Sequence, residues 1–108
     1  MASACTHLDQ VQLRELPGSV EGCDDCLQSG GKWVHLRICL TCGHVGCCDD
    51  SPNRHATAHA GGTSHPIIRS LEPGENWCWC YTDQVAYVLP DVHGQTRIPP
   101  SPLLSGTP

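Results

Sequence analysis

Nine cysteines and seven histidines fall within 108 residues, and most of them occur in short, paired spacings. Two C-x-x-C pairs precede three closely spaced histidines: Cys23 with Cys26, Cys39 with Cys42, then His55, His59 and His65. A C-x-x-C turn directs two thiolates at one ion, and neutral imidazoles can complete a tetrahedral shell. The pattern is therefore typical of structural zinc. Further candidate ligands flank these pairs: Cys5, His7, Cys47, Cys48, Cys78 and Cys80.

A disulfide framework is the alternative use of so many cysteines. Such frameworks usually have an even number of cysteines and little histidine, and they belong to secreted proteins. Here the number is odd, histidine accompanies the cysteines, and no secretory signal precedes them. These features favour zinc thiolates and predict a reducing, cytoplasmic location.

The composition indicates one domain with a small apolar core. Phe is absent, aromatic residues supply 5% of the chain, and Gly and Pro are abundant. A core this poor in large side chains is marginal from burial alone, and structural zinc can supply the missing stability because site formation is coupled to folding. The formal charge of −5 argues against a nucleic-acid partner, and no apolar segment is long enough to span a membrane. We expect a monomer.

Periodicity and turn residues predict the secondary structure. Ser51–Ala60 is expected to be a helix, with Ser51 as its N-cap and Pro52 in the first helical position. Gly61 would end that helix. Strands are expected over Val11–Leu16, Trp33–Ile38, Pro66–Leu71, Trp77–Tyr81 and Val85–Leu89. Residues 1–89 would form the domain, and the Pro-rich residues 90–108 a disordered tail.

Taken together, these motifs resemble the ubiquitin-hydrolase-type zinc finger, ZnF-UBP, which occurs in deubiquitinases, a histone deacetylase and some E3 ligases. The resemblance covers residues 5–89 and depends on many fixed spacings at once: C-x-H at Cys5, the two C-x-x-C pairs, C-G-H-V-G-C ending at Cys47, R-H-A at His55, S-H-P at His65 and W-C-Y at Cys80. It implies a small zinc-stabilised α+β domain. That domain would have a twisted, mostly antiparallel sheet, one or two helices and cross-braced zinc sites.

The resemblance also implies how the ligands divide among the ions. One ion would be held by Cys23, Cys26, Cys47 and His55, and a second by Cys39, Cys42, His59 and His65. Spacing alone would instead pair His55 with His59, which lie four residues apart on one helix face. A third site would combine Cys5 and His7 with two ligands near residue 80. We expect three zinc ions, or two if this third set is incomplete.

Two positions in the ligand assignment have alternatives. The third site could use the C-x-C pair of Cys78 and Cys80, or Cys80 with Asp83, where the family usually has a second cysteine. We favour Asp83, because the x-x spacing is the usual knuckle geometry and aspartate is a competent zinc ligand. Cys48 could also replace its neighbour Cys47.

Family members that bind ubiquitin hold its C-terminal Gly-Gly carboxylate in an aromatic pocket. The resemblance places Trp79, Tyr81 and Tyr87 at the aromatic positions, and Arg37 where the binding members have Trp. Asp49 and Asp50 follow the zinc ligands at the positions where those members have Gly-Arg-Tyr, so the carboxylate-binding arginine is absent.

The function expected is a zinc-binding protein-interaction module that captures the Gly-rich C-terminal tail of a ubiquitin-like partner. The alternative is a structural or docking domain that does not bind ubiquitin. Catalysis is not expected, because nearly every thiol and imidazole has a structural role and a catalytic zinc needs an open position.

Overall fold

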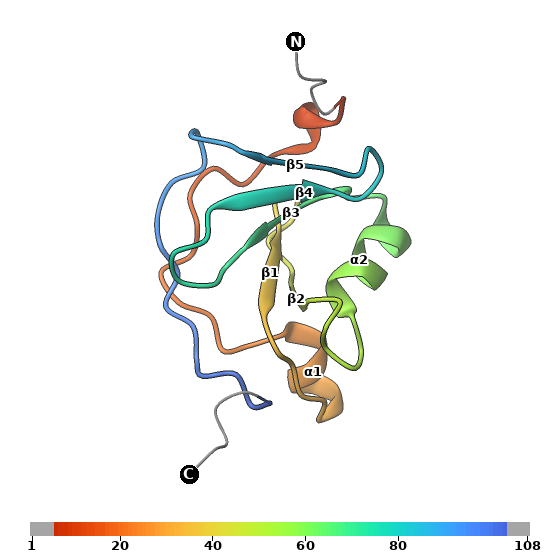
Figure 1. The fold of residues 1–108 in the computed structure, drawn as a ribbon, viewed down its shortest axis with the longest axis vertical. Helices are drawn as coiled ribbons and strands as arrows, with labels where there is room; N and C mark the ends of the chain where they lie inside the picture. Colours follow the sequence, from red (N-terminus) through yellow and green to blue (C-terminus); the bar gives the residue numbers. More distant parts are fainter. Residues whose placement is uncertain (1–5, 104–108) are drawn as a thin grey trace.

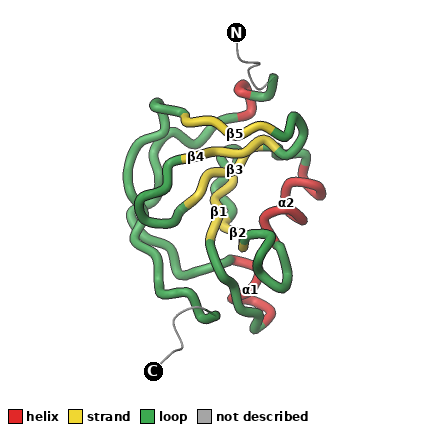
Figure 2. The backbone as a smooth tube through the Cα atoms, in the orientation of Figure 1, coloured by secondary structure: helices red, strands yellow, loops and turns green. Residues whose placement is uncertain are grey.

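One antiparallel sheet of five short strands organises the chain, in the spatial order β2-β1-β3-β4-β5 (Figures 1 and 2). The computed structural model describes residues 6–103. The strands are β1 Leu36–Cys39, β2 Val45–Cys47, β3 Ile67–Ser70, β4 Trp77–Cys80 and β5 Val85–Val88. The helices are the 3-10 turn η1 Leu8–Gln10, α1 Asp24–Ser29 and α2 His55–Thr63. This α+β arrangement confirms the predicted fold class.

Alternation along the strands gives the sheet two different faces. One face, called here the core face, carries buried side chains such as Leu36, Ile38, Ile67, Cys78 and Cys80. The long segments before α1 and after β5 cover this face, as Figure 1 shows. The opposite face, called here the pocket face, carries the alternate residues of the same strands.

Helix α2 packs on the pocket face against β1 and β2. The closest approach is at Gly46 of β2, where a Cβ atom would lie only 2.6 Å from the backbone nitrogen of Ala56. Only glycine allows this separation, because any side chain would displace the helix.

Both helices differ from the sequence-based expectation. Helix α1 was not predicted. It begins inside the first C-x-x-C motif, where the thiol of Cys23 accepts a hydrogen bond from the backbone nitrogen of Cys26. Gly30 ends the helix with a left-handed φ of 81°. Helix α2 begins at His55 rather than Ser51, because the buried Ser51 hydroxyl accepts a hydrogen bond from the Val34 nitrogen (2.8 Å) instead of capping the helix.

The strand predictions were right for four of the five strands, with shifted ends. The expected strand at Val11–Leu16 is absent from the structure; Glu15 there forms only an isolated bridge with His93. Strand β2 was not predicted, since three residues including a glycine carry too little strand signal.

The Pro-rich C-terminal segment lies against the domain as far as it is described, residues 90–103. The backbone of Leu16 donates to His93 (2.8 Å), and that of Arg97 donates to Gly18 (2.9 Å). Val92 is buried in the core and Ile98 packs at its edge. Within residues 90–103 these contacts are not those of a free tail, and the expected division of the chain at residue 89 stays a prediction. No helix among residues 6–103 is long and apolar enough to cross a membrane.

Substituting Val92 tests whether this segment stabilises the domain. Val92→Ala removes two buried carbons and should lower the free energy of unfolding by about 1.5 kcal/mol. The control Leu103→Ala changes an exposed side chain of the same segment and should have little effect. Urea unfolding with excess zinc measures both. Equal stability of the two variants would indicate a dispensable tail.

Candidate functional site

The first cluster of metal-ligating side chains joins α1, β2 and α2. Cys23 and Cys26 come from α1 and its N-cap, Cys47 ends β2, and His55 begins α2. The His55 Nδ1 atom lies 3.3, 3.3 and 3.6 Å from the sulfurs of Cys23, Cys26 and Cys47. The three thiols are buried, so this is a closed site.

The second cluster joins β1, the turn after it, the middle of α2 and the segment that follows α2. Cys39 lies 3.7 Å from His65 Nδ1, and Cys42 lies 3.3 Å from His59 Nε2. All four donor atoms lie within 4.8 Å of one another. This cluster is less enclosed than the first, because the Cys42 side chain is exposed.

Helix α2 thus gives one imidazole to each cluster. His55 and His59 are one turn apart on the same face, but they belong to different ligand sets. In sequence the two sets interleave, because the first spans residues 23–55 and the second spans 39–65. The arrangement is cross-braced and fixes α2 to both C-x-x-C motifs.

A third cluster connects the N-terminal segment to the end of β4. His7, Cys80 and Asp83 lie together, with His7 Nδ1 3.1 Å from Asp83 Oδ2 and 3.6 Å from Cys80 Sγ. The backbone nitrogen and hydroxyl of Thr6 both donate to the same carboxylate oxygen, at 2.7 and 3.0 Å. Cys5, expected as the fourth ligand, lies outside the described residues.

The separations between donor atoms suit zinc. Zn–S bonds of about 2.3 Å and Zn–N bonds of about 2.0–2.1 Å in a tetrahedron place neighbouring donors about 3.5–3.8 Å apart. In the first cluster the separations are 3.3–3.6 Å between sulfur and nitrogen and 4.0 Å between the sulfurs of Cys26 and Cys47. The residues present therefore fit a tetrahedral ion.

Burial controls the protonation of these ligands. It raises the pKa of the thiols of Cys23, Cys26 and Cys39, because removing water penalises the thiolate. It lowers the pKa of His59, and neighbouring His44 and His65 add to the effect. Without a cation the thiols stay protonated, whereas a bound divalent ion stabilises the thiolates that coordinate it.

The cysteines that were not assigned as ligands lie apart from the donor groups. Cys78 faces the core beside Cys80 but is outside the third cluster, and burial raises its pKa although Arg69 acts in the opposite direction. Cys48 contacts the Ser51 hydroxyl (3.5 Å) rather than the first cluster. Of the alternatives that the sequence leaves open, the structure places Cys47 rather than Cys48 in the first cluster, and Asp83 rather than Cys78 in the third.

His44 lies beside the second cluster without belonging to its ligand set. Its ring stacks on the His59 ring with centroids 4.1 Å apart, and its Nε2 lies 3.0 Å from Asp25 of α1. The spacing of the metal ligands along the sequence could not predict this contact between the two clusters.

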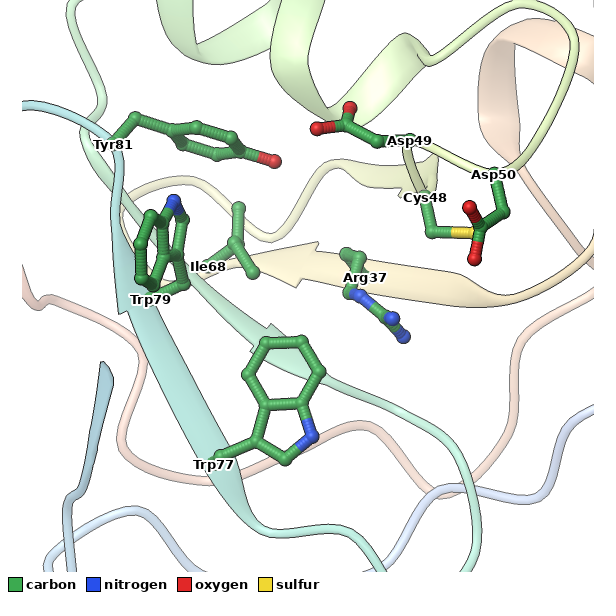
Figure 3. Close-up of a pocket in the computed structure, with 8 residues that line it drawn as sticks. All are labelled: Arg37, Cys48, Asp49, Asp50, Ile68, Trp77, Trp79 and Tyr81. Atoms are coloured by element: carbon green, nitrogen blue, oxygen red, sulfur yellow. The ribbon is translucent and has the colours of Figure 1, made fainter. Parts of the chain in front are cut away.

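A cavity of about 260 Å³ opens on the pocket face beside the first cluster (Figure 3). Its aromatic wall comes from β4 and the residue after it, where Trp77, Trp79 and Tyr81 point to one side by alternation. Ile68 of β3 forms the floor. The remaining lining residues are Arg37, Cys48, Asp49 and Asp50. We call this cavity the aromatic pocket.

Polar contacts fix the two ends of the aromatic pocket. At one end, the Arg37 guanidinium lies 4.6 Å from the centre of the Trp77 ring and donates to Ser70 Oγ (3.3 Å). At the other, Asp49 Oδ1 accepts a hydrogen bond from Thr57 of α2 (2.5 Å). Burial raises the pKa of the Tyr81 phenol, with a smaller contribution from Asp49, so the hydroxyl remains a donor.

Three of the four residues expected to bind ligand meet in this pocket: Arg37, Trp79 and Tyr81. Tyr87 does not, because β5 pairs it with Cys78 and its side chain packs on the core face. Trp77 was not among the expected pocket residues. Its place two residues before Trp79 in a strand would have identified it.

A protein-family model matches more than half of the chain. The family model described as "Zn-finger in ubiquitin-hydrolases and other protein" matches residues 23–91, which include the first two clusters, the aromatic pocket and two residues of the third cluster.

Curated relatives share this region at moderate identity. Ubiquitin carboxyl-terminal hydrolase 16 of Mus musculus is 34% identical over 109 residues, which cover 84% of this chain and 13% of the relative. Ubiquitin carboxyl-terminal hydrolase 44 of Ailuropoda melanoleuca is 33% identical over 91 residues, covering 81% of this chain and 12% of the relative. The chain therefore spans only a small part of these enzymes.

A solved structure resembles nearly the whole chain. Protein RPA1320 from Rhodopseudomonas palustris, determined by NMR in solution, is 49% identical with a TM-score of 0.73. The similarity covers 94% of this chain and 97% of that protein.

Metal content of two variants tests the third cluster. Asp83→Ala should lose one zinc or bind it more weakly, because the carboxylate is within reach of His7 and Cys80. Cys78→Ser should keep the full metal content, since this thiol lies outside the donor group. Elemental analysis after purification without chelator measures both. A Cys78→Ser protein that lacks one zinc would reverse the assignment.

Removing the metal should unfold the domain. Ordering each residue costs about 1–2 kcal/mol of backbone entropy, and a core without Phe contributes little to offset it. A strong chelator should therefore abolish amide dispersion in an NMR spectrum, and added zinc should restore it. The control uses chelator already saturated with zinc. A dispersed spectrum of the metal-free protein would show that the apolar core suffices.

Proposed function

Because this chain belongs to the zinc-finger family of ubiquitin hydrolases, we propose that it is a zinc-stabilised protein-interaction module whose binding site is the aromatic pocket. The observation that carries this proposal is the convergence of two indole rings and one phenol on a single cavity that also holds charged groups. Concave apolar sites with a few polar groups are the usual form of a ligand site.

Three zinc ions would hold this site in place, one in each donor cluster. The first two clusters each supply four donors, and the third supplies His7, Cys80 and Asp83 with Cys5 as the expected fourth ligand. Sites closed by four protein ligands are structural, whereas catalytic zinc keeps a position open for water or substrate. We therefore propose a binding role and no catalysis.

A glycine-rich peptide segment is the occupant that the pocket shape favours. The faces of Trp79 and Tyr81 can pack on a flat backbone that carries no side chains, and a side chain would widen the segment. The family resemblance implies that this segment is the C-terminal tail of a ubiquitin-like partner. In that case Arg37 is the cation of the pocket that would meet the terminal carboxylate.

A structural or docking role without peptide capture is the second candidate function. Asp49 and Asp50 favour this role, because they stand where the ubiquitin-binding members of the family have the arginine that binds the terminal carboxylate. The two functions differ in one property, since only the first needs the aromatic pocket to be accessible.

The setting we propose is a monomer in a reducing compartment such as the cytoplasm, with a protein partner and no nucleic acid. The eight described cysteines form no disulfide with one another, and six of them lie in the three donor clusters. The acidic net charge of −5 disfavours a phosphate backbone as partner.

Peptide titration against a pocket variant tests the proposal. Short glycine-rich peptides should shift the NMR signals of Trp79 and Tyr81, and Trp79→Ala should abolish this response by removing one wall of the pocket. Tyr87→Phe serves as the control, because that side chain lies on the core face, and binding should be unchanged. Zinc content confirms that each variant is folded. A flat response of the unmodified protein to all peptides would favour the structural role.

A further inference from the structure

The aromatic pocket is lined by more negative than positive charge. Two carboxylates, Asp49 and Asp50, and one guanidinium, that of Arg37, face the cavity, which gives it a net charge of −1. All three belong to the binding site proposed above, and their arrangement bears on which end or side chain of a peptide can enter.

The two carboxylates are available to a ligand. Asp49 and Asp50 are exposed, in the loop that leaves β2. Among residues 6–103, neither carboxylate lies within 4.0 Å of a basic side chain, since the ion pairs of this part of the chain involve other acids. The hydrogen bond from Thr57 holds Asp49 in position without neutralising it, and Figure 3 shows its carboxylate on the side of Tyr81.

The guanidinium, in contrast, is already engaged within the protein. Arg37 lies over the Trp77 ring, and one of its terminal nitrogens donates to the Leu36 carbonyl (3.1 Å) and to Ser70 Oγ (3.3 Å). Figure 3 shows it directed toward Trp77 and away from Tyr81. The phenol of Tyr81 therefore points toward the acidic end of the pocket, away from the guanidinium.

We infer that the aromatic pocket selects a primary ammonium group of a partner peptide over a terminal carboxylate; this inference rests on the proposed use of the aromatic pocket as a peptide site, and it replaces the C-terminal tail as the occupant. Aromatic faces attract cations through their ring quadrupole, and a carboxylate beside them adds direct Coulomb attraction. A carboxylate entering the same place would be repelled by Asp49. A lysine side chain and a chain N-terminus present the same ammonium chemistry.

Four peptides that differ in the charged group they carry test this selection by NMR or tryptophan fluorescence titration. Each has the same glycine-rich backbone: one with a free N-terminus and an amidated C-terminus, one capped at both ends with a central lysine, one with only a free carboxylate, and one capped and uncharged. Both ammonium peptides, or one of them, should bind more tightly than the uncharged peptide, and the carboxylate peptide should bind most weakly. The two ammonium arms distinguish the N-terminus from lysine.

Two variants separate a local charge effect from a general one. Asp49→Asn keeps the size of the side chain and should weaken ammonium binding about fivefold or more, the ratio given by the attraction of unit charges 4 Å apart in water. Glu21→Gln removes one exposed negative charge that does not line the pocket and should change binding little. Unchanged zinc content shows that both variants are folded.

The possible outcomes distinguish this inference from the proposed function. Tighter binding of the carboxylate peptide, equal binding of all four peptides, or an Asp49→Asn variant with unaltered affinity would overturn the selection of ammonium, while pocket-dependent binding would still support the interaction module. No binding of any peptide would overturn both.

Discussion

The rest of this structure depends on one constraint: several sulfur donors lie close together where they are buried from water. Three thiols and one imidazole nitrogen lie within 4.8 Å of one another in the first cluster, where burial disfavours the thiolate. A divalent cation resolves this conflict, and its ligands come from α1, β2 and α2. The same ion would therefore place both helices on the sheet, a role that a larger apolar core has in other domains.

The sequence predicted the α+β class, four strands and the partners of most ligands, because these depend on fixed spacings and alternation. It could not predict from spacing that His55 and His59 serve different clusters, since both lie on one helix face; the family resemblance supplied that division. Helix α1 was missed because a thiol, not an apolar stripe, organises it. Tyr87 was misplaced because its face depends on the register between β4 and β5.

Strand β4 shows how one short segment can serve stability and recognition together. Cys78 and Cys80 point to the core face, while Trp77 and Trp79 point to the aromatic pocket. The third cluster holds the end of this strand through Cys80, so a change at that cluster would also move the aromatic wall. The acidic loop that leaves β2 approaches the pocket from the other side, and the order of the strands brings β1 and β3 between these two elements.

The interleaving of the first two ligand sets has a consequence for the order of events during protein synthesis. No four-ligand set is complete until His55 has left the ribosome, and by then Cys39 and Cys42 of the second set are already exposed beside it. An emerging chain therefore offers several surplus thiols to one ion before the correct partners exist. An ion that binds such surplus thiols early would have to exchange ligands before its own set of four forms, and labile metal–sulfur bonds allow this exchange.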